Sequence, residues 1–418
     1  MKNNIIIKSL LVVIVVFIAS IYLPQIYWKT FPYRYTLPRV YYSPIIEDIL
    51  ILKQVNGRGR IKDLNGKSYS MKEFESLVPQ SNYSQLVYDG LLPDSVNGVE
   101  FDVPELRKNF FRVAIKPVKV FSFDLLLYPL IESAPDRPNL VYPDEFFTIK
   151  DRVKIINASL NEENEVFSTI FTDALKDNGF IFPPKKIFGN PTTRKPFDEG
   201  YFIVDNKNDL FHVKRVKDMP YCRKIELPEG TKIVYADVVE KSLQEFYGFF
   251  ITEKNDLLLI SYDDYKIINI PIKSYDYQNS NLNIVGDILY RTISVINDNK
   301  VSFFIFNREY ERVTEYHDLV THKSESTQGV LAAYLFPFTL SLSSEKSQFI
   351  NFYFETTGFG FILFNIALSI LFIVFLYLRK ATFKDNYAFI ALLLLTGIYG
   401  IVPIFLIRNF NQSNSGGV

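Results

Sequence analysis

The sequence predicts a mainly β, propeller-like domain with helical insertions, joined to three transmembrane α-helices. Long uncharged apolar stretches lie near the two ends of the 418-residue chain, and their length is typical of membrane-spanning helices. Between them, short apolar runs alternate with polar turns, which indicates antiparallel β-hairpins. The 46 basic and 46 acidic residues cancel. A general nucleic-acid partner is therefore not expected, since phosphate binding requires a surplus of positive charge.

The first predicted element is an N-terminal span over residues 1–28. Its apolar part, SLLVVIVVFIASIYLPQIYW, has about the 20 residues needed to cross a bilayer and ends in the aromatic pair Tyr27 and Trp28. It is either a signal anchor or a cleavable signal peptide. Residues 18–20, Ile-Ala-Ser, would serve as a cleavage site. The apolar run continues past that site to Trp28, which favours an anchor.

Two further spans are predicted over residues 356–378 and 387–407, where the chain carries no charge within the apolar stretches. The loop between them, 379–386, holds Arg379, Lys380 and Lys384 against the single acid Asp385. Short loops rich in Lys and Arg stay in the cytoplasm. The expected topology therefore has the N-terminus inside, residues 29–355 outside and the tail 408–418 outside.

This topology predicts a multi-pass protein of the bacterial inner (cytoplasmic) membrane, with its main domain in the periplasm. Cys222 is the only cysteine in the chain, so an intramolecular disulfide is excluded. A large extracytoplasmic domain without disulfides fits a bacterial envelope protein. We expect the Cys222 thiol to be a small buried hydrophobic group.

The second and third spans lack the ionisable residues that a proton relay or an ion path would require. They do carry polar and small residues at helical spacing: Asn365, Ser369, Gly397 and Gly400. Such residues allow helices to approach closely and to form hydrogen bonds across the membrane. They predict either packing of these two spans on each other or contact with a separate membrane partner.

The extracytoplasmic region contains repeated hairpin patterns over about residues 200–316. The stretches 200–213 and 248–260 both read as an aromatic strand, a turn ending in Asn-Asp and a second apolar strand, and 290–306 is a looser copy. The turns recur at roughly 40 to 50 residues, which falls in the range of propeller blades. The alternative fold is an irregular β-sandwich.

Earlier elements can also be predicted locally. Residues 48–55 read as a strand, a hairpin turn is expected at Asn65-Gly66, and 71–77 read as a short helix. A longer amphipathic helix is expected to begin at a capping box of Ser159 and Glu162 and to end at Gly179. The apolar segment 330–342 is too short to span a bilayer, so it is either a buried strand pair or a segment lying on the bilayer surface.

The most irregular stretch, 183–200, reads PPKKIFGNPTTRKPFDEG. A long loop of this kind braces domains or contacts a partner, or it forms a small-molecule site. The residues that we expect at such a contact are Lys185, Lys186, Asn190, Arg194, Lys195, Asp198 and Glu199. The three histidines match no zinc pattern, and no nucleotide-binding or hydrolase motif occurs. The sequence therefore predicts no catalytic residue, cofactor or metal site.

The segment GNPTTRKPFDEGYFIVD, residues 189–205, placed between one N-terminal span and a C-terminal pair of spans, resembles an uncharacterised family of Bacteroidota envelope membrane proteins. The resemblance covers nearly the whole chain and implies an envelope location, beside a transporter of the ATP-binding-cassette type. Two functions follow as expectations. One is a membrane-anchored, non-enzymatic accessory or scaffold protein with the bilayer and a membrane protein as partners. The other is an envelope enzyme acting on glycan or lipid through paired carboxylates.

Overall fold

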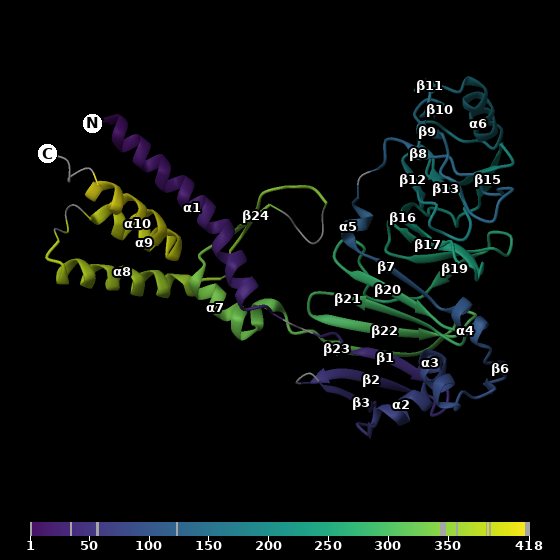
Figure 1. The fold of residues 1–418 in the computed structure, drawn as a ribbon, viewed down its shortest axis with the longest axis horizontal. Helices are drawn as coiled ribbons and strands as arrows, with labels where there is room; N and C mark the ends of the chain where they lie inside the picture. The colour runs from purple at the N-terminus through teal and green to yellow at the C-terminus, as the bar shows by residue number, and fades with distance from the viewer. Residues whose placement is uncertain are drawn as a thin grey trace. The chain divides into compact units, whose positions relative to one another are not determined.

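The computed structural model describes residues 2–33, 36–55, 58–122, 124–342, 348–356, 358–381, 383 and 386–413. The chain forms two compact units. The β-rich unit comprises residues 37–319, and the helical unit combines residues 1–36 with residues 320–418. Figure 1 shows the elements of each unit.

The β-rich unit is built from five antiparallel sheets in which chain neighbours pair as meanders. The first sheet contains β1 Arg39–Ser43, β2 Asp48–Val55, β3 Arg58–Asp63 and β4 Ser68–Tyr69. The second contains β8 Tyr128–Pro129, β9 Glu145–Ile149, β10 Val153–Asn157 and β11 Glu162–Glu163. The third contains β12 Lys186–Gly189, β13 Tyr201–Val204, β14 Leu210–Val216 and β15 Met219–Ile225. The predicted strand over 48–55 is confirmed as β2.

The fourth sheet contains β16 Ile233–Val238, β17 Phe246–Thr252, β18 Leu257–Ser261 and β19 Ile267–Ile270. The fifth contains β20 Asn281–Gly286, β21 Arg291–Ile296, β22 Lys300–Phe306 and β23 Arg312–Leu319, with β7 Phe111–Ile115 added beside β20. A separate hairpin pairs β5 Ser95–Val96 with β6 Val99–Glu100. The predicted repeats are the hairpins β13–β14, β17–β18 and β21–β22.

Strands β13, β17 and β18 of the third and fourth sheets are packed on both faces, which explains why they read as continuous apolar runs instead of alternating ones. All residues of β13 and β17 are buried. From β13, Phe202 and Val204 pack into a core shared with the fourth sheet, whereas Tyr201 and Ile203 pack into a core shared with the second. On its other face, the fourth sheet shares a core with the fifth. The sheets are therefore stacked face to face.

The prediction of a propeller is corrected by this arrangement. Within the described ranges, the protein is a β-rich domain with helices, made of several small sheets and with no closed propeller or barrel. The reason lies in the first two sheets, where strands such as β3 and β10 alternate buried and exposed residues. The first sheet exposes Arg60 and Lys62, and the second exposes Lys154. Because these polar faces are solvated, they provide no apolar surface on which another sheet could pack to close a propeller.

Five helices belong to the described part of this unit. They are α2 Met71–Leu77, α3 Pro79–Asp89, α4 Val103–Asn109, α5 Pro117–Val120 and α6 Glu165–Asp177. The predicted short helix over 71–77 is confirmed as α2, which begins at a capping box formed by Ser70 and Glu73. Phe74 of α2 packs on Leu50 and Ile61 of the first sheet.

The predicted start of the longer helix is wrong by several residues. The helix α6 begins at Glu165, and Asn164 caps it by accepting a hydrogen bond from the Phe167 amide. Glu162 instead lies in β11, which pairs with β10. Ser159 donates its hydroxyl to Asp144. The tertiary pairing of β11 therefore overrides the local capping signal.

The helical unit contains α1 Lys2–Thr30, a 3-10 turn Lys323–Glu325, α7 Thr327–Leu335, β24 Thr339–Ser341, β25 Tyr353–Glu355, α8 Gly360–Leu378, α9 Tyr387–Thr396 and α10 Ile398–Ser413. The apolar segment 330–342 forms most of α7 and then β24, which pairs with β25. Ala332 and Phe336 pack with Ala19 of α1 and Tyr399 of α10. This segment therefore belongs to the core of the helical unit.

Two described helices are long and apolar enough to cross a membrane, Ile6–Thr30 within α1 and the whole of α8. The third apolar stretch differs from the single helix expected over 387–407. It is divided at Gly397, which has φ +55° and ψ −128°, into α9 of 10 residues and α10 of 16. Of the predicted cytoplasmic loop and tail, Thr382, Lys384, Asp385 and residues 414–418 lie outside the described residues.

Candidate functional site

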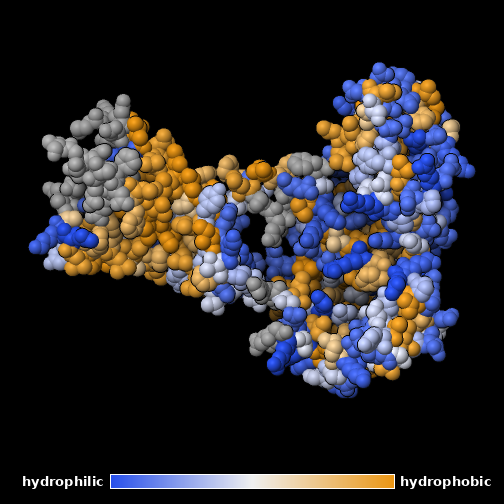
Figure 2. All heavy atoms as spheres, viewed as in Figure 1, coloured by the Kyte–Doolittle hydropathy of each residue, from blue (hydrophilic) through white to orange (hydrophobic). Residues whose placement is uncertain are grey.

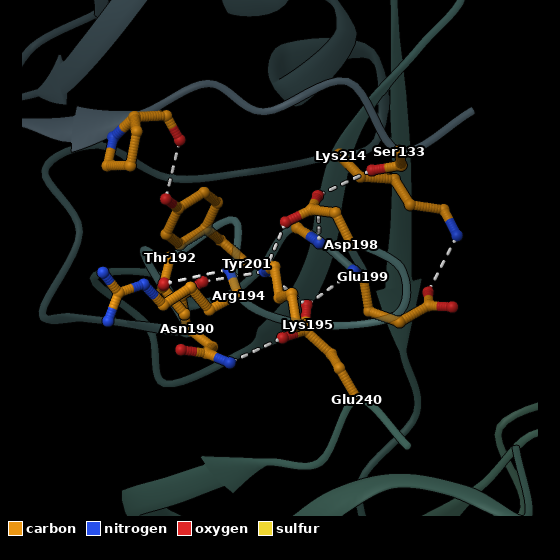
Figure 3. Close-up of polar contacts among 12 residues, drawn as sticks. Ser133, Asn190, Thr192, Arg194, Lys195, Asp198, Glu199, Tyr201, Lys214 and Glu240 are labelled. Atoms are coloured by element: carbon orange, nitrogen blue, oxygen red, sulfur yellow. Dashed lines mark hydrogen bonds and ion pairs between the residues drawn. The ribbon is translucent and has the colours of Figure 1, made fainter. Parts of the chain in front are cut away.

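A buried cluster of charged side chains lies where the loop between β12 and β13 meets the chain that follows β16. Figure 3 shows this cluster around Lys195. The loop provides Asn190, Lys195, Asp198 and Glu199, and Glu240 comes from the chain two residues beyond β16. The loop belongs to the third sheet and Glu240 to the fourth, so the cluster joins two stacked sheets.

Lys195 is the centre of the cluster, with only 3% of its side chain exposed. Its ammonium group lies 2.6 Å from Asp198 Oδ1 and 2.7 Å from Glu240 Oε1, and it also donates to the carbonyl oxygen of Asn190. A lysine ammonium has three protons to donate. All three are therefore used inside the protein, and none is left for a ligand.

Both carboxylates have further donors. Asp198 Oδ2 accepts hydrogen bonds from the Ser133 hydroxyl and the Gly200 amide. Glu240 accepts from the Asn190 side-chain amide and from the Glu199 amide. Burying a charge is tolerated when it is paired and hydrogen-bonded, and these contacts meet that condition for each of the two acids.

The cluster continues through Glu199 to a group of aromatic residues. The Glu199 carboxylate bonds Lys214 at 2.9 Å and accepts a hydrogen bond from the Tyr262 hydroxyl. Its backbone carbonyl contacts His212 Nε2, and His212 Nδ1 contacts the Tyr265 hydroxyl. Burial lowers the pKa of His212 to about 3. This imidazole is therefore neutral at physiological pH and serves as a hydrogen-bonding group in the core.

Glu240 differs from an ordinary glutamate in its protonation. Burial raises the pKa of Glu240 to about 7, and this effect exceeds the opposing one of the Lys195 charge. Because the folded protein binds this proton more tightly than the unfolded chain, whose value is 4.5, the resulting stabilisation is complete below pH 4.5 and is lost as the pH rises through 7.

The variant Glu240→Gln tests this pH dependence. Between pH 4.5 and pH 7, the unfolding free energy of the wild type should fall by about 3 kcal/mol relative to that of the variant, since each pKa unit corresponds to about 1.4 kcal/mol. The measurement is denaturant unfolding across that pH range. The variant Glu253→Gln, at an exposed position, is the control, and its unfolding free energy should change with pH as that of the wild type does. A difference that grows with pH would show that the ion pair with Lys195 is the larger effect.

The structure brings together four of the seven loop residues predicted as a contact site: Asn190, Lys195, Asp198 and Glu199. The other three lie apart from the cluster. Lys185 bonds the Asn208 side chain, Lys186 pairs with Asp124 at 3.2 Å, and Arg194 is exposed. The sequence pattern did not indicate Glu240, Ser133, Lys214 or His212. Ser133 and Glu240 lie far from the loop in the chain and approach it through the packing of the sheets. Lys214 and His212 lie in β14, which pairs with β13 directly after the loop.

A cavity of about 190 Å³ opens in the β-rich unit near the start of the same loop. Its polar lining includes Lys119, Ser122, Asp124, Tyr128 and Lys186. Lys119 pairs with Asp237 at 3.4 Å and Lys186 pairs with Asp124. The two lysines are thus already neutralised by carboxylates from the protein.

The residues predicted to pack within the membrane also have defined positions. Asn365 of α8 donates its side-chain amide to the Leu394 carbonyl of α9 at 3.0 Å, and Gly397 lies directly against its side-chain oxygen. Ser369 donates to the carbonyl of Asn365 within α8. Gly400 lies instead against Leu392 and Thr396 of α9. Asn365 and Gly397 therefore join α8 to α9, and Gly400 joins α10 to α9.

Among the described residues, no group of three or more histidine, cysteine, aspartate or glutamate side chains is placed to hold a metal ion. Cys222 is half-buried in β15, and burial raises its pKa to about 12. A thiol that remains protonated is a poor nucleophile.

These features define a β-rich protein with a long apolar N-terminal helix, of the kind found in membrane or exported proteins. The chain belongs to the family described as a domain of unknown function, DUF4857, whose model matches residues 39–306. The matched region lies within the β-rich unit. A comparison with curated proteins finds no match.

Two solved structures show slight similarity to the chain. One is the dihydro-haem d1 dehydrogenase NirN in complex with DHE, with a TM-score of 0.23 and 9% identity, covering 61% of this chain and 62% of NirN. The other, from Bacteroides fragilis NCTC 9343, is described as a candidate exported protein, with a TM-score of 0.14 and 7% identity, covering 54% of this chain and 85% of that one. The chain thus spans less than two thirds of the length of NirN. Scores this low do not indicate a common fold.

Proposed function

We propose that this protein is a membrane-anchored, non-enzymatic accessory or scaffold protein of the bacterial envelope. Its helical unit lies in the inner membrane, and its β-rich unit binds a protein partner or ligand in the periplasm. The observation that carries this proposal is the apolar outer surface of the helical unit. The β-rich unit adds a second observation, because the charged groups of its buried cluster pair with one another.

The helix α8 supports the membrane location. Only 17% of its most apolar 18-residue stretch is buried within the structure. Leu363, Leu371 and Leu378 are 66%, 65% and 74% exposed, and Figure 2 shows hydrophobic residues across the visible face of this helix. A helix that is apolar all round must be covered by protein or by lipid. Since the described chain leaves most of α8 uncovered, lipid or a membrane partner is required.

Aromatic residues at the end of α1 support the same location. Tyr27, Trp28 and Phe31 form ring contacts there, and the Lys323 ammonium lies 4.0 Å from the centre of the Trp28 ring. The Tyr27 hydroxyl donates to the Gln328 carbonyl. Tryptophan and tyrosine are enriched at membrane interfaces, where the ring is apolar and its polar atom meets water. This end of the helix therefore suits the membrane surface.

The charged cluster supports a structural use of the loop 183–200 rather than a catalytic one. A glycosidase-type enzyme requires two carboxylates with a substrate space between them. Asp198 and Glu240 are indeed paired, but they share Lys195, are almost fully buried and do not line the cavity. Their arrangement holds two sheets together. A unit held rigid in this way is suited to binding a partner on its surface.

The exposed residues of the predicted contact loop, Lys185 and Arg194, provide a test of partner binding. We expect a membrane protein to co-purify with the full-length chain in mild detergent, a transporter of the ATP-binding-cassette type being the partner that the family resemblance implies. The double variant Lys185→Glu/Arg194→Glu should lose this partner. The double variant Lys232→Glu/Lys254→Glu, which makes the same charge change at exposed positions elsewhere, should retain it. Mass spectrometry of each eluate is the measurement, and recovery of the wild-type chain alone would contradict the proposal.

A further inference from the structure

The two C-terminal helices do not continue one another as a single span. Gly397 ends α9 with a backbone conformation that a right-handed helix does not contain, φ +55° and ψ −128°. A positive φ of this kind favours glycine, because a side chain would clash with the backbone. The chain therefore changes direction sharply between Thr396 and Ile398.

The position of Gly400 shows that α10 folds back onto α9. A Cβ atom added at Gly400 would lie 3.3 Å from the Leu392 carbonyl oxygen and 3.2 Å from the Leu392 side chain. In a continuous helix, residues eight positions apart are separated by about 12 Å along the axis. Contact between Leu392 and Gly400 therefore requires a sharp bend between the two helices, and Figure 1 shows α10 lying beside α9. Gly400 has no side chain, so the two arms can approach closely.

The lengths of the arms fit half of a membrane. The helix α9 has 10 residues, which corresponds to about 15 Å at 1.5 Å per residue. The apolar part of α10, residues 398–407, precedes Arg408 and has a similar length. The hydrocarbon core of a bilayer is about 30 Å thick. Neither arm can cross it alone, whereas a hairpin can enter it and return.

The tip of the hairpin is enclosed by protein, as a non-helical segment within the membrane must be. Asn365 of α8 is only 1% exposed, and its amide donates to the Leu394 carbonyl, near the point where α9 ends. On the other side of the turn, Tyr399 is fully buried and donates its hydroxyl to the Phe338 carbonyl. The helix end at Gly397 therefore needs no contact with lipid.

The direction of each arm follows from these contacts. Asn365 lies near the start of α8 and contacts the end of α9, so the two helices are antiparallel and α9 rises from the side of Arg379. The helix α10 then returns, and Figure 1 shows it leading back toward the N-terminal end of α1. Charge agrees with this direction, because Arg379 and Lys380 follow the end of α8 and Arg408 follows the apolar part of α10 in the chain, and the positive-inside rule favours one side for such residues.

We propose that α9 and α10 form a re-entrant hairpin that enters and leaves the membrane on the side of the 379–386 loop. The C-terminal tail then shares that side with the N-terminus, instead of lying in the periplasm as the apolar length of 387–407 predicts. Only α1 and α8 cross the bilayer. This inference rests on the membrane location proposed above.

Cysteine labelling tests the proposal, since Cys222 is the only native cysteine and its protonated thiol should react slowly. Three variants of the full chain are compared with the wild type as blank: Ser413→Cys after the hairpin, Phe383→Cys in the loop and Ser76→Cys in the β-rich unit. A membrane-impermeant maleimide is applied to spheroplasts before and after permeabilisation. We expect the Ser76→Cys variant to react in intact spheroplasts, and the Phe383→Cys and Ser413→Cys variants to react only after permeabilisation.

The two possible failures can be distinguished. Labelling of the Ser413→Cys variant together with the Ser76→Cys variant, and opposite to the Phe383→Cys variant, would overturn the hairpin and establish a third span. Equal labelling of the Phe383→Cys and Ser76→Cys variants would instead show that α8 does not cross the membrane. That result would overturn the proposed membrane location itself.

Discussion

Replacement of Lys195 with methionine is expected to lower the unfolding free energy of the β-rich unit by about 3–5 kcal/mol, the usual cost of removing one partner from a buried ion pair. Asp198 and Glu240 would remain buried without the cation that both contact within 2.7 Å. Methionine keeps most of the apolar length of the side chain, so the loss reports mainly on the charge. Denaturant unfolding of the full chain in detergent, followed by circular dichroism, provides the measurement.

The same variant should depend on pH. Because burial raises the pKa of Glu240 to about 7, this carboxyl is largely neutral at pH 5, and the variant should lose more stability at pH 8 than at pH 5. The matched control is Lys224→Met. Lys224 also contacts an acid at 2.7 Å, Asp209, but both side chains are more than a third exposed. That pair should contribute at most about 1 kcal/mol. Equal losses for the two variants would contradict a special role for the buried cluster.

The second large effect is expected at Gly200, which follows the cluster and begins the turn into β13. Its φ is +64°, and an added Cβ would lie 2.4 Å from the Val213 carbonyl oxygen and 2.8 Å from the Lys214 Cα atom. These contacts are with backbone that is paired in the sheet. The variant Gly200→Ala should therefore lose about 2–5 kcal/mol, from the unfavourable φ and from the displaced backbone together.

Gly230→Ala is the control that separates these two causes. Gly230 has a similar φ, +73°, but an added Cβ there would meet no atom within 4 Å. Its substitution should cost only the conformational penalty, about 1–2 kcal/mol. The two variants are compared by the same unfolding measurement. If both lose the same amount, the close approach of Gly200 to β14 does not affect stability.

Local patterns were sufficient for several elements of the fold. The strand over 48–55 and the helix over 71–77 were predicted from residues that lie next to each other in the chain. The hairpins at β13–β14 and β17–β18 were found in the same way. Where a tertiary contact competed with a local signal, the prediction failed, as at Ser159, where the pairing of β11 moved the start of α6 to Glu165.

The charged cluster was only half visible in the sequence. Lys195 and Asp198 are three residues apart in a loop rich in proline and glycine, so the loop could be singled out. Glu240 is 45 residues from Lys195, and no spacing rule connects them. Their contact depends on how the third and fourth sheets stack, which is decided by apolar side chains on both faces of β13 and β17.

By itself, the sequence determined that the chain has long apolar helices at its ends and a β-rich region between them, because hydropathy and strand alternation are properties of neighbouring residues. Only the tertiary structure decided that the sheets form an unclosed stack, that Lys195 holds two sheets together and that the last apolar stretch folds back at Gly397. Each of these depends on contacts between residues distant in the chain or on the direction of the backbone at one glycine. Apolar length alone does not distinguish a span from a hairpin, because both can be built from the same run of apolar residues.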